Sequence, residues 1–122
     1  MSELVEQADR AAANAYAPYS GYRVGAVLRT VDGREFSGVN VENAAYPLTQ
    51  CAETTAIGAA AAAGYRPGEI AAIGINASPC GACRPWLYEW RIPEVSFRRD
   101  DGSVATYEAA ALLPDTWDLP AT

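Results

Sequence analysis

The fold is decided by residues 22–41, which read YRVGAVLRTVDGREFSGVNV. Apolar and β-branched residues recur on both sides of Asp32-Gly33, and an Asp-Gly pair between such runs is typical of a hairpin turn. The stretch therefore predicts two neighbouring strands, Tyr22–Thr30 and Arg34–Val41, joined by a tight turn.

Upstream of this hairpin, residues Ser2–Tyr16 are expected to form a helix. Leu4, Ala8 and later alanines recur at helical spacing, and acidic residues occupy the first turns, where the helix dipole favours negative charge. The proline and glycine of the segment 17–21, APYSG, end this pattern. The chain is thus expected to enter the hairpin from a helix.

Downstream, helices and strands alternate. The expected segments are a loop at Glu42–Gln50, a helix at Cys51–Ala63 ended by Gly64, a buried strand at Ile70–Ile75, a helix at Cys80–Trp90, short edge strands at Val95–Phe97 and Ser103–Thr106, a short helix at Tyr107–Leu113 and a tail at Pro114–Thr122. This order predicts an α/β fold: a three-layer α/β/α sandwich around a mixed five-stranded sheet, with an antiparallel hairpin followed by parallel crossovers. We expect a single domain over residues 1–122.

Composition excludes several kinds of chemistry. The 122 residues carry a net charge of −6 and include neither histidine nor lysine. Without histidine there is no Ser-His-Asp or Cys-His catalysis, and without lysine there is no Schiff base. An acidic chain without a basic stripe is not expected to bind a nucleic-acid polymer. We see no secretion leader and no membrane span, and the odd number of cysteines fits a reducing compartment, so we expect a cytoplasmic protein.

The three cysteines form the most informative pattern. They occur as Cys51-Ala52-Glu53 and as Pro79-Cys80-Gly81-Ala82-Cys83, both at expected helix starts, where unpaired N–H groups favour thiolates. Three thiolate ligands with a fourth position open is the arrangement of a catalytic zinc site. We therefore predict one Zn²⁺ per chain, bound by Cys51, Cys80 and Cys83.

Glu53 follows the first of these cysteines by two residues. In a helix this spacing is about 200° around the axis, so Glu53 is poorly placed to bind the same metal. In the first turn its long carboxylate can still reach the open position and carry protons. Two other interpretations of the cysteines are a Cys-x-x-Cys redox pair and three buried structural thiols. A third alternative is a non-catalytic zinc-binding module, which would have no use for Glu53.

Cys-x-Glu followed by Pro-Cys-x-x-Cys is the signature of zinc-dependent deaminases of nucleosides and nucleobases, here in an all-cysteine form. The likeness extends to the segments 17–20 (APYS), 24–26 (VGA), 38–46 (GVNVENAAY) and 80–84 (CGACR). Taken together, residues from about 8 to 117 resemble the small homotetrameric cytidine deaminases. The resemblance implies zinc-dependent hydrolysis of cytidine or deoxycytidine to uridine or deoxyuridine plus ammonia, a step of pyrimidine salvage, with Glu53 as the catalytic proton carrier.

The resemblance also implies how the nucleoside is bound. In the family the positions of Asn40 and Glu42 hold the sugar, chiefly its 3′-hydroxyl, and these two side chains share one face of a strand end. Tyr22 stands where an aromatic ring lies against the base, although core packing is an equally open reading of that residue. The backbone N–H of Ala52 corresponds to the group that contacts the pyrimidine O2.

Two more aromatic residues correspond to positions that cross between subunits in the resembling family. Tyr46 matches a residue that contacts a neighbouring subunit, and Trp117 stands where a C-terminal phenylalanine reaches a neighbour's site. The alanines of the Cys51–Ala63 helix, with their small side chains, would let the helices of four subunits approach closely. We expect a homotetramer with D₂ symmetry.

Three departures from the family pattern concern the site. Thr54 replaces an arginine that donates to the thiolates, so the helix N-termini and Arg84 would have to compensate the negative charge. Pro85 replaces a glutamine, and the loop before Pro79 is shortened.

Glu42, in an acidic chain without lysine, disfavours a phosphorylated substrate. An alternative substrate is a modified cytosine nucleoside such as a blasticidin S-like antibiotic.

Overall fold

A computed structural model describes residues 2–118, so the last residues of the expected tail lie outside the described part. One sheet is present in it, with strands β1 (Gly25–Thr30), β2 (Glu35–Val39), β3 (Ile70–Ile75), β4 (Val95–Arg98) and β5 (Val104–Tyr107). The helices are α1 (Ser2–Ala11), α2 (Ala52–Ala62) and α3 (Arg84–Glu89), with short 3₁₀ helices η1 (Ala12–Asn14), η2 (Tyr46–Leu48) and η3 (Ala109–Leu112).

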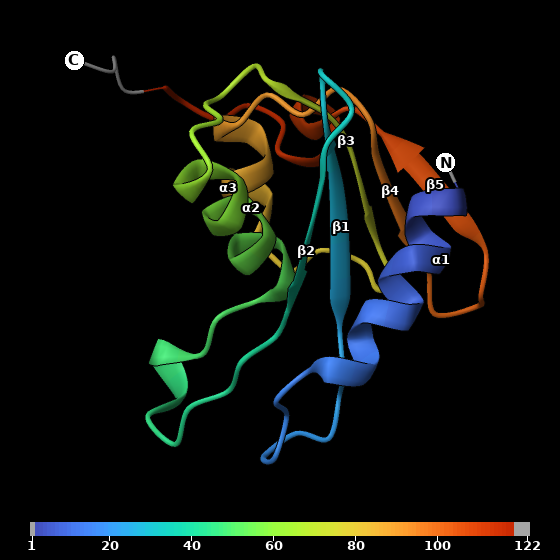
Figure 1. Ribbon diagram of the computed structural model, residues 1–122, viewed down its shortest axis with the longest axis vertical. Coiled ribbons are helices and arrows are strands. Elements are labelled where there is room, and N and C mark those ends of the chain that lie inside the picture. The colour runs from blue at the N-terminus through green and yellow to red at the C-terminus, as the bar shows by residue number, and fades with distance from the viewer. Residues whose placement is uncertain (1, 119–122) are drawn as a thin grey trace.

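The predicted fold class is confirmed. The sheet has the order β2-β1-β3-β4-β5, with α1 against one face and α2 and α3 against the other (Figure 1). Alternate residues of β1 divide between the faces: Val27 packs with Leu4 and Ala8 of α1, whereas Ala26 and Leu28 belong to the larger core. This alternation follows from the two-residue period of a strand. None of the described helices is both long enough and apolar enough to cross a bilayer.

The hairpin forms as expected, but the rest of the sheet is less parallel than expected. β1 and β2 pair antiparallel across residues 31–33, and Gly33 has the positive φ of 93° that such a turn requires. β3 then lies antiparallel to β1 on its other side, and only β3 and β4 are parallel. The expectation of two edge strands near the C-terminal end was wrong for β4, which lies between β3 and β5.

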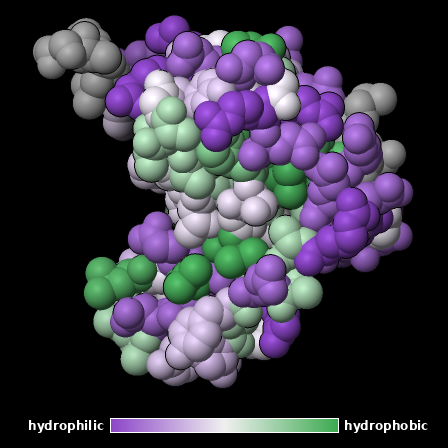
Figure 2. Space-filling view, in the orientation of Figure 1, coloured by the Kyte–Doolittle hydropathy of each residue, from purple (hydrophilic) through white to green (hydrophobic). Residues whose placement is uncertain are grey.

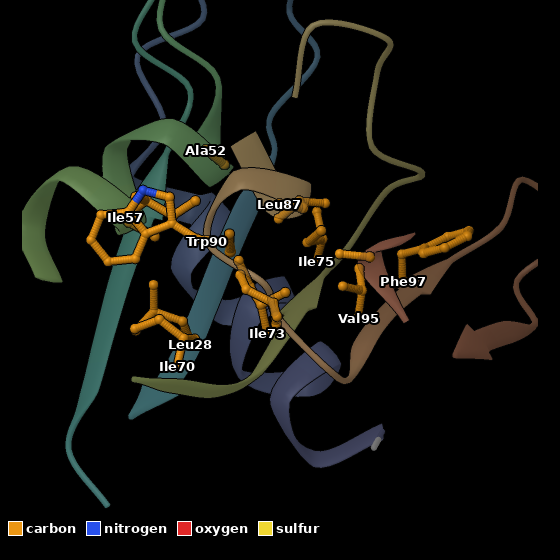
Figure 3. Packing of buried hydrophobic residues seen from close by; sticks show 14 of the residues in the cluster. Leu28, Ala52, Ile57, Ile70, Ile73, Ile75, Leu87, Trp90, Val95 and Phe97 are labelled. Atoms are coloured by element: carbon orange, nitrogen blue, oxygen red, sulfur yellow. The ribbon is translucent and has the colours of Figure 1, made fainter. Parts of the chain in front are cut away.

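The larger core fills the space between the sheet and the α2–α3 layer. Figure 3 shows side chains of β1, β3 and β4 meeting those of both helices. Ala52, Ala56 and Ala60 of α2 are fully buried there. The sequence interpretation assigned these alanines to contacts between subunits, and that was wrong for these three. The exposed face of α2 carries Gly58 and Ala62 instead.

Several element boundaries differ from the expected ones. α1 ends at Ala11 and continues only as a 3₁₀ turn, and residues 21–24 are not part of β1. The helix expected at Cys80–Trp90 is confined to Arg84–Glu89, because residues 80–83 form a turn in which the Cys83 N–H donates to the Cys80 carbonyl. Both cysteines therefore precede the helix.

Glycines let the helices approach the sheet closely. A Cβ on Gly38 of β2 would lie 2.3 Å from the Ala56 nitrogen of α2, and one on Gly74 of β3 would lie 2.4 Å from the Leu4 carbonyl carbon of α1. No side chain fits between backbones at these distances. The two layers of helices are thus seated directly on the sheet.

Two loops project together from one end of the sheet and form what we call the lobe, residues 16–24 and 40–50. They are joined where Tyr16 bridges to Val41 as in a parallel strand pair. Figures 1 and 2 show the lobe below α2, with a hollow between it and the body and with apolar side chains gathered on it. Its exposed large side chains include Tyr19, Tyr46 and Leu48. The end of β3 and the start of α2 lie at the same end of the molecule as the lobe.

Candidate metal centre and active site

The three cysteines converge as the sequence predicted. All are free thiols, and their sulfur atoms lie within 4.8 Å of one another. The Sγ–Sγ distances are 3.9 Å for Cys51 and Cys80 and 3.5 Å for Cys80 and Cys83. Tetrahedral zinc with Zn–S bonds of about 2.3 Å places its ligand sulfurs about 3.8 Å apart. The three sulfurs therefore fit zinc, and no fourth side chain within residues 2–118 joins the group.

The surroundings of the three cysteines favour the thiolate form unequally. Burial pushes the pKa of Cys80 upward, but its hydrogen bond with the Cys83 thiol and those from the backbone N–H groups of Cys83 and Ala82 outweigh this effect and lower the pKa. Burial raises the pKa of Cys51 and, together with the nearby charge of Glu53, raises that of Cys83. Without a cation, three thiolates cannot coexist at these distances, so the site is built for a metal that replaces the thiol protons.

Glu53 lies in the first turn of α2 and is 3% exposed. Burial raises the pKa of its carboxyl group, and hydrogen bonds from its own backbone N–H and from the Cys83 thiol only partly offset this. A buried carboxyl group beside the cysteine cluster, with a pKa moved toward neutrality, is suited to both take up and release a proton. Glu53 is not among the clustered ligands, as its helical spacing indicated.

The side chains of Thr54 and Arg84 both donate hydrogen bonds to backbone carbonyls beside the cysteines. The Thr54 hydroxyl donates to the Cys51 carbonyl at 2.9 Å. Arg84 was expected to offset the negative charge, but its guanidinium donates to the Pro79 carbonyl at 3.0 Å and to the Leu112 carbonyl at 3.4 Å. Arg84 thus fixes the loop before Cys80 instead. Pro85 fits because it is the second residue of α3, where an N–H has no helical partner.

Asn40 lies directly after β2 and is 9% exposed. Its Oδ1 accepts from the Val24 N–H at 2.9 Å, and its Nδ2 donates to the Tyr22 carbonyl at 2.8 Å. Only one orientation of the amide serves both partners, so the side chain is fixed. Asn40 therefore ties the strand end to the segment that carries Tyr22.

Glu42 is held in the same way and is 7% exposed. Its Oε1 accepts from the N–H groups of Tyr19 at 3.0 Å and Ser20 at 3.1 Å, and its Oε2 accepts from the Ser20 hydroxyl. The Ser20 hydroxyl and these N–H groups lower the pKa of Glu42 against the opposing effect of burial. The carboxylate is consequently charged near neutral pH.

The remaining candidate residues differ in exposure. Ala52 is fully buried and is the first residue of α2, where its N–H has no helical partner. The Tyr22 and Tyr46 side chains, both on the lobe, are 60% and 72% exposed. Trp117 is 75% exposed. Its neighbour Asp118 accepts from the Tyr88 hydroxyl, near the end of α3 opposite to Cys83. Because the Tyr22 side chain is exposed, it does not pack in the core of this chain, and that alternative interpretation of Tyr22 is excluded.

Two residues at the site were not identified from the sequence. Ser20 belongs to the quoted segment 17–20, yet only the structure shows its hydroxyl on Glu42, 22 residues away. Gly38 was quoted next to Asn40, yet only its contact distances show that α2 rests on it. Both residues belong to segments that resemble the family, but the residues that they contact are distant in the sequence.

Over residues 1–99 the chain matches the family described as the cytidine and deoxycytidylate deaminase zinc-binding region. The crystal structure of cytidine deaminase from Burkholderia pseudomallei is 48% identical, with a TM-score of 0.88 over 95% of this chain and 98% of that chain. Cytidine deaminase from Mycobacterium tuberculosis is 40% identical over 116 residues, covering 92% of this chain and 85% of the relative. A probable cytidine deaminase from Dictyostelium discoideum is 38% identical over 119 residues, covering 93% of this chain and 81% of the relative.

Proposed function

The chain belongs to the cytidine and deoxycytidylate deaminase family, and on this premise we propose that it hydrolyses cytidine and deoxycytidine to uridine and deoxyuridine plus ammonia. The observation that carries the proposal is the buried Glu53 carboxyl group beside three convergent thiols. A zinc ion that only stabilised the fold would need no such carboxyl group.

The proposed catalytic roles divide between the cysteines and Glu53. Cys51, Cys80 and Cys83 would hold zinc, which as a Lewis acid lowers the pKa of water. Glu53 would accept a proton from water and deliver it to N3 of the pyrimidine, which makes C4 electrophilic. After hydroxide has added to C4, Glu53 would take the proton of the new C4 hydroxyl and give it to the departing amine as the C4–N bond breaks, so one carboxyl group serves both transfers.

We assign the binding of the nucleoside to the strand end and the lobe. Asn40 and Glu42 would bind the sugar hydroxyls, Tyr22 would face the base, and the Ala52 N–H would donate to the pyrimidine O2. The charged Glu42 supports a substrate without a phosphate group, because a phosphate near this carboxylate would be repelled. A role in pyrimidine salvage agrees with free nucleosides as substrates.

The experiment that tests the function compares cytidine with its 5′-monophosphate. Purified protein, with its metal content measured, should lower the ultraviolet absorbance of cytidine and contain about one zinc per chain. We expect kcat/KM for cytidine to exceed that for the monophosphate by at least about tenfold, the equivalent of 1.4 kcal/mol of repulsion. Equal values for the two compounds would refute the assignment to nucleosides, and no turnover of either would refute the deaminase.

We also propose that the protein forms a homotetramer with D₂ symmetry, acting as one domain over residues 1–122 in the cytoplasm. Support for the assembly comes from the large exposed aromatic side chains of Tyr46 and Trp117 and from the small exposed residues Gly58 and Ala62 of α2. Exposed apolar side chains of this kind are stabilised when a second copy of the chain buries them. Free thiols gathered at one site support a reducing compartment.

Light scattering should therefore give about 52 kDa, four times the 12.9 kDa of one chain. Because Trp117 is proposed to complete a neighbour's site, Trp117→Ala should raise KM for cytidine about tenfold and leave the zinc content unchanged. Trp117→Phe, which keeps an aromatic ring, serves as the matched control and should stay close to wild type. A fully active monomer would contradict both the assembly and the role of Trp117.

A further inference from the structure

The Ser20 hydroxyl has two partners whose directions are fixed. Its oxygen accepts a hydrogen bond from the Tyr22 N–H at 3.0 Å. The same hydroxyl donates to Oε2 of Glu42. A hydroxyl has a single proton, so this proton is committed to Glu42 and Ser20 has none to donate to a substrate.

The Glu42 carboxylate has one acceptor position left. An ionised carboxylate offers about four lone-pair positions. Two on Oε1 are taken by the N–H groups of Tyr19 and Ser20, and one on Oε2 is taken by the Ser20 hydroxyl. The fourth position, also on Oε2, is free to accept from a hydroxyl of a bound molecule. A charged carboxylate has no proton to donate, so a phosphate or ether oxygen cannot replace that hydroxyl.

The surroundings of this carboxylate are held by the backbone of the lobe. The Glu42 N–H donates to the Tyr16 carbonyl at 2.9 Å, and Asn40 fixes the carbonyl of Tyr22. Ser20 itself is exposed and fills no core position. Loss of its hydroxyl would release one oxygen of Glu42 and the N–H of Tyr22. The hydrogen bond from Asn40 to the Tyr22 carbonyl and the backbone hydrogen bonds of the lobe would stay in place.

We propose that Ser20 is a positioning residue that directs the free acceptor position of Glu42 toward a single sugar hydroxyl of the substrate. The proposal rests on the proposed function for the identity of that hydroxyl, the 3′-hydroxyl of a nucleoside. Ser20 acts through Glu42 and does not contact the base or the reacting atoms. Its contribution belongs to the binding of the substrate and depends on the presence of the hydroxyl.

The test measures wild type, Ser20→Ala and Ser20→Thr with cytidine and with 3′-deoxycytidine. For cytidine, Ser20→Ala should raise KM about tenfold with kcat within about twofold of wild type, the size expected for one hydrogen bond to a charged group. For 3′-deoxycytidine, the same variant should differ from wild type by less than about twofold, because the group that Glu42 accepts from is missing. Ser20→Thr keeps the hydroxyl and should restore binding of cytidine.

Each contrary result is decisive. An equal penalty on both substrates, or none on cytidine, would overturn the proposal. So would loss of zinc or of the cooperative melting transition in Ser20→Ala, since Ser20 would then be a structural residue. If wild type does not deaminate cytidine, the proposed function fails. Calorimetric binding of cytidine then decides the inference: about tenfold weaker binding by Ser20→Ala supports it, and equal binding or no binding by wild type overturns it.

Discussion

Replacing Glu53 with glutamine is expected to leave zinc bound and to lower kcat on cytidine by about 10²–10⁴-fold, the usual contribution of general acid–base catalysis. The amide has nearly the same shape as the buried carboxyl group, but it can neither take a proton from water nor pass one to the pyrimidine. Since Glu53 is not among the three clustered ligands, the metal site should survive the change. Metal analysis and steady-state kinetics on the same preparation check both halves of this expectation.

Two comparison variants make the result specific to Glu53. Glu89→Gln removes the same charge from the exposed end of α3 and should behave as wild type. Cys80→Ala/Cys83→Ala should lose both zinc and activity, because only one sulfur of the cluster is left. Should Glu53→Gln retain activity within about tenfold of wild type, below the range for general acid–base catalysis, Glu53 would have no part in the proton transfers.

The two halves of the site could be predicted because the information for each is local, whereas their meeting across 29 residues was predicted from the deaminase signature. Cys51 and Glu53 lie two residues apart, and Cys80 and Cys83 lie three apart, so each pair is brought together by one turn of chain whatever the rest of the fold does. The helical spacing also placed Glu53 outside the ligand group, which agrees with the structure. The hairpin was predictable for the same reason, since Asp32-Gly33 determines its own turn.

Features that depend on distant contacts could not be predicted. A helix of nearly uniform alanine has no apolar stripe, so the sequence could not show that Ala52, Ala56 and Ala60 face the core. Tyr22 begins a run of strand-like residues, but hydrogen bonds with Asn40 and Ser20 hold it in a loop. In both cases tertiary contacts outweigh local propensity.

Gly38 shows how one such contact supports the whole site. A Cβ at this position would lie 2.3 Å from the Ala56 nitrogen and 2.4 Å from the Ala52 carbonyl oxygen. Both are backbone atoms of α2, so they cannot rotate away as a flexible side chain would. The Thr55 hydroxyl also donates to the Val39 carbonyl at 2.9 Å and ties the same turn of α2 to β2. Since α2 begins immediately after Cys51, any displacement of this helix separates Cys51 from the other two thiols.

Gly38→Ala is therefore expected to lower the free energy of unfolding by about 1–3 kcal/mol, the usual cost of an overpacked core, and to weaken zinc binding. Urea denaturation and metal competition check the two effects. Gly74→Ala is the matched comparison, because its Cβ would meet the Leu4 backbone of α1, which carries none of the proposed site residues. It should lose similar stability and keep its zinc affinity under conditions in which both variants are folded. Equal loss of zinc affinity in the two variants would mean that general destabilisation, and not the contact between α2 and Gly38, determines the zinc affinity.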